Sequence, residues 1–354
     1  MNNPIRDILE QHAVKVSAPC RIDLGGTVDI SVFFYPLYHL GPSTFNIALD
    51  MRTSVRLSLH APGLVKVSSA GFTSVEHPVD QMPFDHPLGL IFAIAAYFNI
   101  DGIHIEIDSS SPPKSALGGS SVAAVAVIAA FSRLLVLAGK TGVEFDRIPL
   151  LAHAVEESLA GVPCGCQDQL AAAYGGVNAF FWKGAGSDKW FERKSLLSAE
   201  DAGWLNERML VSYCGVQHDS RDINSRWIAG FIDGTCRSQW VDIVECTRGF
   251  INAFEAKDVA SAVRWMNRET VIRMDMTPDV VDGIGEKLVL AAQKIGCGAR
   301  FTGAGGGGCV WALGEPGAIS TLKPEWNAIL NVRKDARLLD TAVDMAGVAD
   351  HREV

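Results

Sequence analysis

Two glycines and two serines stand together at the end of the stretch Pro112–Ser121, which reads Pro-Pro-Lys-Ser-Ala-Leu-Gly-Gly-Ser-Ser. Residues 102–108 before it alternate isoleucine with polar residues, which predicts a half-buried strand. Residues 122–138 after it are rich in Ala, Val and Leu and contain no breaker, which predicts a helix. The first N–H groups of a helix lack internal partners, and the helix dipole is positive there. This loop is therefore a candidate site for an anion such as a nucleotide phosphate, which the glycines would allow to approach the backbone.

Two other interpretations of this loop and helix stay open. A core helix capped by a serine would bind nothing. The apolar run is also nearly long enough to span a membrane, but Arg133 interrupts it and no comparable second run exists, which favours a buried helix. The loop is not a Walker loop, because no Gly-Lys-Ser/Thr ending is present.

A second candidate for chemistry is the carboxylate of Asp168, which stands between Gln167 and Gln169 after a run of small residues. A positioned carboxylate without a metal-ligand pattern around it is a candidate general base, with a helix N-cap as the structural alternative. Cys164 and Cys166 have no matching His or Cys pair nearby, so no metal site is predicted from them.

A glycine-rich loop at residues 303–308 contains a Gly-x-Gly-x-x-Gly match. A dinucleotide fold requires a helix after this motif, whereas residues 309–313 have the pattern of a strand. Each glycine costs about 0.5–1 kcal/mol against alanine, and a close approach of backbone to a ligand would justify that cost. A flexible hairpin that binds nothing is the alternative.

Composition places the chain among soluble globular proteins, with 354 residues, 48% hydrophobic and 20% charged. This length allows two domains. The net charge of −9 and the lack of a basic cluster argue against nucleic acid or an anionic membrane as the main partner. The eight cysteines are scattered without a Cys-x-x-Cys pair, and the first eleven residues carry no secretory signal, so we expect free thiols and a cytoplasmic protein. The sequence leaves the oligomeric state open, a homodimer included.

Strand and helix patterns follow one another in two halves, with the polar segment 184–201 as the candidate boundary. We expect an N-terminal nucleotide-binding and catalytic domain over residues 1–190 and a C-terminal domain over residues 200–354. The expected strands are residues 14–24, 51–59, 64–68, 102–108, 177–182, 209–213, 299–302 and 309–313. The expected helices are residues 88–98, 122–138, 145–159, 227–255, 259–273 and 280–295.

Three separated motifs, at residues 18–29, 113–121 and 301–308, together resemble the GHMP kinase superfamily of galactokinase, homoserine kinase, mevalonate kinase and phosphomevalonate kinase. The resemblance spans roughly residues 14–313. Residues 155–169 are most similar to the sugar kinases, both galactokinase and bacterial heptose 7-phosphate kinase. The resemblance implies an α+β fold with two domains, an N-terminal ribosomal-protein-S5-like α/β domain and a C-terminal ferredoxin-like α/β domain.

The sequence departs from the family pattern in two motifs. Galactokinases carry Glu-His-Thr-Asp where this chain has Gly26-Thr27-Val28-Asp29, a difference that favours the heptose kinase branch, as does the segment 215–224. We expect Gly26, in place of an acidic side chain, to leave space or charge for a different acceptor substituent. In the phosphate loop, Ala116 and Gly119 replace a glycine and a serine of the family.

The resemblance also implies roles for individual residues. ATP would be bound by Pro113, Leu117, Gly118, Gly119, Ser120 and Ser121. Mg²⁺ would be held by Ser120 and Glu156, with Glu157 as the rival carboxylate. Asp168 would act on the acceptor hydroxyl beside Arg21, as a base or as an electrostatic stabiliser. The acceptor would contact Asp29, Gly26, Gln167, Gly305 and Gly306, and the polar loop with His218, Ser220 and Arg221 would reach the nucleotide or the sugar.

The sequence thus predicts an ATP- and Mg²⁺-dependent kinase that phosphorylates a hydroxyl, the anomeric one by preference, of a monosaccharide or sugar phosphate. Heptose 7-phosphate is the first candidate acceptor, and galactose or a uronic acid comes next. Two other hypotheses are an amino-alcohol or isoprenoid-alcohol kinase and a catalytically silent sensor of nucleotide or sugar. An NAD-binding dehydrogenase is the remaining alternative.

Overall fold

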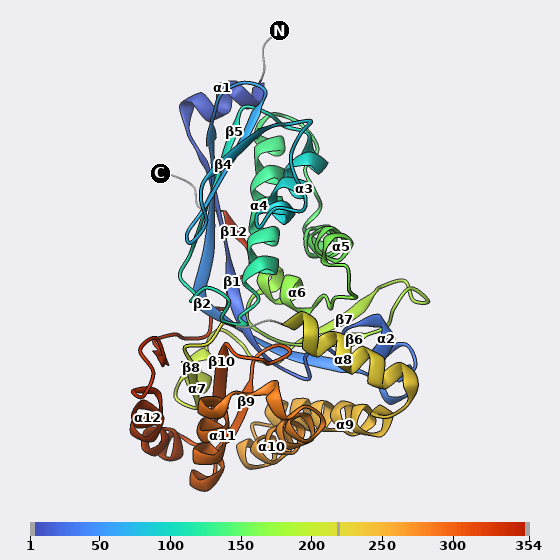
Figure 1. The fold of residues 1–354 in the computed structure, drawn as a ribbon, viewed down its shortest axis with the longest axis vertical. Helices are drawn as coiled ribbons and strands as arrows, with labels where there is room; N and C mark the ends of the chain where they lie inside the picture. The colour runs from blue at the N-terminus through green and yellow to red at the C-terminus, as the bar shows by residue number, and fades with distance from the viewer. Residues whose placement is uncertain (1–3, 218–219, 351–354) are drawn as a thin grey trace.

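The computed structural model describes residues 4–217 and 220–350, which form two sheets with helices packed on them (Figure 1). The first sheet has the strand order β12-β1-β2-β5-β3-β4, with β6 paired to β2 and β7 to β6. Its pairs are antiparallel except for β3 and β5. Its strands are β1 Val14–Leu24, β2 Ser43–Leu59, β3 Leu64–Ser69, β4 Val75–Pro78, β5 Ile103–Ser109, β6 Val177–Trp182, β7 Phe191–Ser195 and β12 Ala349–Asp350.

The long strand β2 connects the two parts of the first sheet, because one half pairs with β5 and the other half with β6. Val55 and Leu57 are buried and alternate with the exposed Ser54 and Arg56. This alternation turns one face of the sheet to the core and the other to solvent.

Helices cover one face of the first sheet, and α4 lies along it (Figure 1). In the described residues, α4 alone is long and apolar enough to cross a membrane, but 72% of its apolar window is buried inside the protein. The apolar run therefore forms core, as the sequence favours. The helical segments of this half are α1 Pro4–Gln11, α2 Ser31–Phe34, η1 Tyr38–Leu40, α3 Gly89–Phe98, α4 Gly119–Leu137, η2 Phe145–Arg147, α5 Ile148–Ala160 and α6 Gln167–Tyr174.

The second sheet is antiparallel throughout, with the order β11-β8-β10-β9. Its strands are β8 Met209–Tyr213, β9 Gly298–Phe301, β10 Cys309–Leu313 and β11 Arg337–Leu339. The helical segments of this half are α7 Ala202–Asn206, α8 Ser220–Asp233, α9 Arg237–Glu255, α10 Val259–Met276, η3 Pro278–Val280, α11 Gly283–Ile295 and α12 Pro316–Leu330.

The expected strands 14–24, 177–182, 209–213 and 309–313 occur with the same limits. The expected helix 227–255 is wrong in its middle, because α8 ends at Asp233 and α9 begins at Arg237. Gly234 between them has φ +92°, and the Thr235 N–H donates to the Asp233 side chain, so the chain turns there. The polar segment 184–201 is not purely a linker, since it contains β7.

The segment 341–350 crosses from the second half back to the first sheet. Asp344 N donates to Ala48 O at 2.9 Å and Gly176 N donates to Asp344 O at 2.8 Å, and β12 then pairs with β1. The side chain of Arg52 holds this segment, because it bonds to Asp344 and donates to Gly347 O at 2.6 Å. The predicted limit of 200–354 for the second domain includes this segment, although its strand lies in the first sheet.

Candidate active site

A buried ion pair joins β1 to the start of α6. The register of β1 against β2 shifts between Pro19 and Cys20, where proline cannot donate to the ladder, and Arg21 follows the shift. Arg21 Nη2 lies 2.7 Å from Asp168 Oδ1, and Nε donates to the same oxygen at 2.8 Å. Arg21 Nη1 donates to Ala116 O at 2.6 Å. One guanidinium thus fixes both α6 and the loop that precedes α4.

Asp168 is the more accessible member of this pair, with 23% of its side chain exposed against 3% for Arg21. Cys166 is the N-cap of α6, so Asp168 lies inside the first turn of the helix and does not cap it. Burial would lower the pKa of Arg21, but the carboxylates of Asp168 and Asp23 raise it above its ordinary value. The Asp168 side chain thus has a cationic partner on one side and is partly exposed on the other.

The phosphate loop ends at Gly118, which has φ +84° and is the N-cap of α4 without a side-chain capping bond. The alternative of a serine-capped helix is wrong, because Ser120 and Ser121 donate to Glu156 instead. A Cβ at Gly119 would meet no atom within 4 Å, whereas one at Gly118 would lie 3.4 Å from Asp168 Oδ2. The start of α4, with its unpaired N–H groups, therefore has free space at Gly119 and lies beside the Asp168 carboxylate.

The other residues of this loop divide into buried and exposed ones. Leu117 is buried and its carbonyl accepts from Arg21 N at 3.1 Å, while Pro113 is exposed. Ala116 adopts φ +62°, a left-handed conformation that is uncommon outside glycine. The family glycine is thus replaced without loss of the left-handed turn, and Arg21 bonds to its carbonyl.

The carboxylate of Glu156 on α5 accepts hydrogen bonds from three side chains. Its Oε1 accepts from Ser120 Oγ at 2.6 Å, and its Oε2 accepts from Ser121 Oγ and from Gln169 Nε2, both at 2.7 Å. Burial raises the pKa of Glu156 above its ordinary value. The neighbouring Glu157, the rival carboxylate, instead accepts a hydrogen bond from Cys164 N at 3.3 Å. The predicted pair Ser120 and Glu156 therefore offers two adjacent hard oxygens, a set that fits the one or two protein ligands typical of Mg²⁺.

Asp29 and Gln167 meet on the other side of Asp168. Asp29 Oδ2 accepts from Gln167 N at 2.9 Å, and the Gln167 side chain accepts from Asn46 Nδ2 at 3.2 Å. Burial raises the pKa of Asp29 to about 7, and the negative charges of Asp168 and Asp23 act in the same direction. A carboxyl group with a pKa near neutral pH therefore lies beside Asp168, the candidate base.

Gly26 does not leave the space that the sequence predicts. A Cβ at this position would lie 2.3 Å from Asp23 Oδ2 and 2.7 Å from Gln167 Nε2. The turn therefore approaches its neighbours closely, and glycine is required for packing rather than for an additional substituent.

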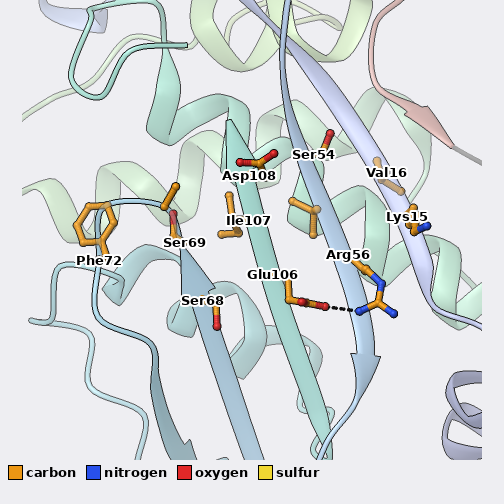
Figure 2. A pocket seen from close by; sticks show the side chains of 12 residues that line it. Lys15, Val16, Ser54, Arg56, Ser68, Ser69, Phe72, Glu106, Ile107 and Asp108 are labelled. Atoms are coloured by element: carbon orange, nitrogen blue, oxygen red, sulfur yellow. Dashed lines mark hydrogen bonds and ion pairs between the residues drawn. The ribbon is translucent and has the colours of Figure 1, made fainter. Parts of the chain in front are cut away.

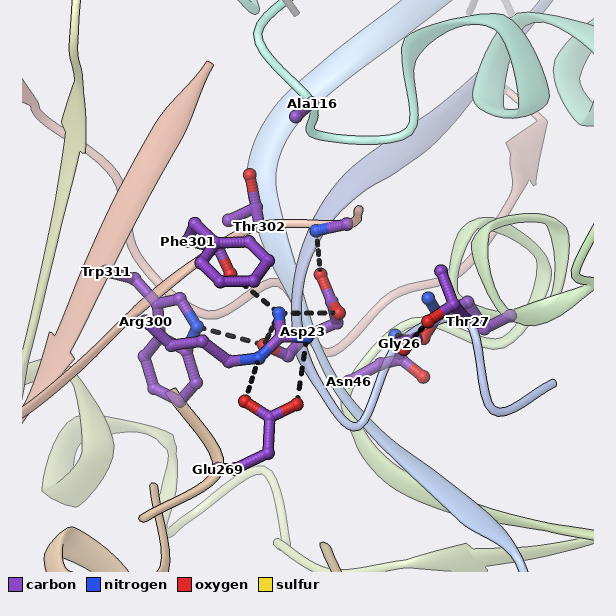
Figure 3. Close-up of polar contacts among 12 residues, drawn as sticks. Asp23, Gly26, Thr27, Asn46, Ala116, Glu269, Arg300, Phe301, Thr302 and Trp311 are labelled. Atoms are coloured by element: carbon purple, nitrogen blue, oxygen red, sulfur yellow. Dashed lines mark hydrogen bonds and ion pairs between the residues drawn. The ribbon is translucent and has the colours of Figure 1, made fainter. Parts of the chain in front are cut away.

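A network of buried charges joins Glu269 and Arg300 to Asp23 (Figure 3). Glu269 accepts from Arg273 Nε at 2.8 Å and from Arg300 Nε at 2.9 Å, with all three side chains fully buried. Arg300 Nη1 lies 3.1 Å from Asp23 Oδ2, and Arg273 Nη2 donates to Gly26 O at 2.7 Å. Helix α10 and strand β9 of the second half thus hold the end of β1 and the turn that carries Asp29.

The glycine loop at 303–308 approaches the chain's own backbone. Gly303 N donates to Asp23 Oδ1 at 2.6 Å, and Gly306 N donates to Val280 O at 2.7 Å. A Cβ would lie 2.3 Å from Val280 O at Gly305 and 2.6 Å from Ser115 O at Gly308. The glycines are therefore needed to pack this loop against η3 and the phosphate loop. Contact of Gly305 and Gly306 with the acceptor stays a prediction.

Two cavities lie away from this site. One, of about 680 Å³, is a groove over strands β1, β2, β3 and β5, and the ion pair between Arg56 and Glu106 crosses its wall (Figure 2). The other, of about 670 Å³, is lined by residues of α3, α4 and α5 that include Tyr97 and Leu150. Neither contains a residue predicted to do chemistry. His218 lies outside the described residues, and Ser220 and Arg221 begin α8.

Sequence reasoning did not assign roles to Asp23, Asn46, Glu269, Arg273 and Arg300. One signal was present, because Asp23 and Arg300 are charged residues inside segments patterned as buried strands. Glu269 and Arg273 stand four residues apart on a helix, a spacing that is usually found in exposed pairs. Only the fold shows that these two side chains point inward.

The comparisons with known proteins agree with this geometry. Residues 86–176, which include the phosphate loop, Glu156 and Asp168, match the sequence profile described as GHMP kinases N terminal domain. Arg21 and the glycine loop lie outside the matched region. This part of the chain is therefore similar to the N-terminal domain of GHMP kinases, and the similar proteins described next are themselves named kinases.

Three relatives show the range of the family. Mevalonate kinase of Thermococcus onnurineus is 26% identical over 331 residues, which cover 85% of this chain and 89% of the relative. Galactokinase of Roseiflexus sp. is 24% identical and covers 90% of this chain and 89% of its own. Probable glucuronokinase 2 of Arabidopsis thaliana is 27% identical over 69% of this chain and 66% of its own.

Solved structures confirm the fold. Lactococcus lactis galactokinase, complexed with galactose, has a TM-score of 0.75 at 17% identity and covers 99% of this chain and 100% of its own. A D-glycero-D-manno-heptose 1-phosphate kinase from Bacteroides thetaiotaomicron has a TM-score of 0.72 at 16% identity, with 96% and 99% covered. Streptococcus pneumoniae phosphomevalonate kinase, in complex with phosphomevalonate and AMPPNP, has a TM-score of 0.71 at 16% identity, with 94% and 99% covered. The predicted α+β GHMP kinase fold is thus confirmed.

Proposed function

We propose that this chain is an ATP- and Mg²⁺-dependent sugar kinase that phosphorylates a hydroxyl, by preference the anomeric one, of a monosaccharide or sugar phosphate. The observation that carries the proposal is the position of Asp168, fixed by Arg21 and adjoining the open start of α4 at Gly118. A carboxylate beside a phosphate cradle is the arrangement that phosphoryl transfer to a hydroxyl requires.

Each residue then has a defined task. The N–H groups of Gly119 to Ser121 bind phosphate oxygens at the start of α4. Ser120 and Glu156 would hold Mg²⁺, which supplies positive charge to the transferring phosphate. Arg21 orients Asp168 and places a positive charge beside it, so that Asp168 accepts the hydrogen bond, and finally the proton, of the acceptor hydroxyl.

Heptose 7-phosphate is the first candidate acceptor, and galactose or a uronic acid comes next. The likeness of residues 26–29 and 215–224 to the heptose kinase branch supports the first candidate. Relatives named galactokinase and glucuronokinase support the sugars that come next. Mevalonate is the competing acceptor, because relatives named mevalonate kinase match 85% of this chain.

The test is a panel of acceptors assayed for ADP release with ATP and Mg²⁺, containing heptose 7-phosphate, galactose, glucuronic acid, galacturonic acid and mevalonate. We expect turnover of one sugar or sugar phosphate, and ³¹P NMR of its product shows which hydroxyl was phosphorylated. Turnover of mevalonate with none of the sugars would overturn the proposal. Nucleotide binding without turnover of any acceptor would favour the silent sensor.

A further inference from the structure

Three buried side-chain oxygens around the start of α6 have no hydrogen-bond donor among the described residues: Asp29 Oδ1, Asn46 Oδ1 and Gln169 Oε1. The other polar atom of each side chain is engaged, so the side chains are fixed. A buried acceptor without a donor costs about 1–3 kcal/mol. Three such oxygens at the first turn of one helix indicate that a bound molecule supplies donors there.

Two of these oxygens, those of Asp29 and Asn46, lie on the side of Asp168 where we propose that the phosphate-accepting substrate binds. Asp29 and Asn46 both bond to Gln167, at 2.9 Å and 3.2 Å, and Gln167 directly precedes Asp168. Gln169 instead bonds to Glu156, which belongs to the phosphate and metal side. Asp29 and Asn46 are 4% and 0% exposed, so bulk water does not satisfy them.

The chemistry of the missing partner follows from the atoms that lack it. Asn46 Oδ1 is an amide oxygen that only accepts, whereas Asp29 Oδ1 accepts when the carboxyl group is ionised and donates when it is protonated. The ligand must therefore present a donor to Asn46 and a group that can both donate and accept to Asp29. A carboxylate or phosphate at this place would meet the carboxyl groups of Asp29 and Asp168, and the nearby guanidinium of Arg21 is already bonded to Asp168 and Ala116 O. Hydroxyl groups satisfy both acceptors without this repulsion.

We infer that Asn46 determines specificity for the acceptor and that it binds, together with Asp29, two hydroxyls of an uncharged polyol end placed beside Asp168; this rests on the proposed function. Strand β2 positions the side chain, because Asn46 lies opposite Asp23 of β1 and Asn178 of β6 in the sheet register. Its neighbours Phe45 and Ile47 are buried core residues, and alternation along the strand turns Asn46 to the other face, toward Gln167.

The test compares wild type with Asn46→Leu, which keeps the approximate shape of the side chain without polar atoms, and with Asn46→Ala as a second variant. For the acceptor that wild type phosphorylates, we expect KM to rise about tenfold in both variants, with kcat and the KM for ATP changed less than threefold. The matched control is Thr44→Val on the same strand, a buried hydroxyl without a partner that lies opposite Phe180, for which KM should not change.

Monodeoxy analogues of the acceptor give the sharper result. One analogue should lose affinity in wild type but lose almost none further in Asn46→Leu, because the missing hydroxyl and the missing amide belong to the same contact. An unchanged acceptor KM in folded Asn46→Leu and Asn46→Ala, with sugar turnover intact in wild type, would overturn this inference alone. Wild type that phosphorylates mevalonate and no sugar would overturn both the inference and the proposed function.

Discussion

At the scale of single residues, the site depends on carboxyl groups held in different environments. Asp168 is paired with Arg21 and partly exposed, whereas Asp29 is buried with one oxygen unsatisfied. Glu156 is half-buried, and three donors compensate its charge. Differences in environment of this kind separate the roles of otherwise identical groups.

Replacing Asp168 by Asn should lower kcat by about 10²–10⁴-fold, because the amide cannot accept the proton of the acceptor hydroxyl. The KM for ATP should change little, since Asp168 does not belong to the phosphate cradle. Steady-state kinetics and nucleotide binding by calorimetry check both parts. A variant that retained more than a tenth of the wild-type kcat would limit Asp168 to a minor role.

The pKa of about 7 at Asp29 predicts how stability depends on pH. Because the folded-state pKa is raised, the unfolded chain ionises first, and the free energy of unfolding falls as pH rises from about 4 to 7. Asp29→Asn removes this dependence and should stabilise the protein by about 2–4 kcal/mol at pH 8, with a much smaller effect near pH 4. Urea unfolding at pH 4.5, 6 and 8 measures it, and equal effects at all three values would contradict the raised pKa.

At the scale of elements, the sequence predicts those whose patterns are long and regular. Strands β1, β6, β8 and β10 and helix α4 were predictable from alternation or from an unbroken apolar run. The orientation of Asp168 inside α6 was not, because a carboxylate near a helix start has the same local pattern whether it caps the helix or faces a ligand. The mutual packing of the glycine loop and the phosphate loop depends on contacts between distant segments.

Gly119 and Gly283 allow a matched test of the phosphate cradle. Each begins a helix, and a Cβ at either position would meet no atom within 4 Å. Alanine at each should therefore leave stability unchanged or raise it by up to about 1 kcal/mol. Gly119→Ala should also raise the KM for ATP several-fold, because its methyl group would occupy the place that we propose for a phosphate, whereas Gly283→Ala should not. Thermal melts and ATP titrations distinguish the two, and equal KM values would remove Gly119 from the nucleotide site.

At the scale of the whole molecule, the two halves are joined by buried charge. Glu269, Arg273 and Arg300 from the second half reach Asp23 and the Gly26 turn of the first. Burial would raise the pKa of Glu269, but Arg300 and Arg273 lower it below its ordinary value. The sequence predicted two domains and a family resemblance, and it marked Asp23 and Arg300 as charged residues in buried-strand patterns. It did not indicate that they meet, because they are far apart along the chain.

Glu269→Gln should destabilise the protein by about 3–5 kcal/mol, because it leaves two fully buried guanidinium groups without their shared carboxylate. Asp242→Asn is the control, since Asp242 forms an exposed pair with Arg268 at 3.1 Å and should cost less than about 1 kcal/mol. Chemical denaturation of both variants measures the difference. If Glu269→Gln lowered the free energy of unfolding no more than Asp242→Asn does, the buried network would not stabilise the contact between the two halves.

The return of the segment 341–350 to the first sheet has a consequence for biosynthesis. While the ribosome is still making the second half, the β1 edge at Val16 and Ser17 has no β12, and Arg52 has neither Asp344 nor Gly347 to hold. The first sheet is therefore completed only after residues 349–350 have emerged, and until then the first half has an open β-edge that other chains could pair with.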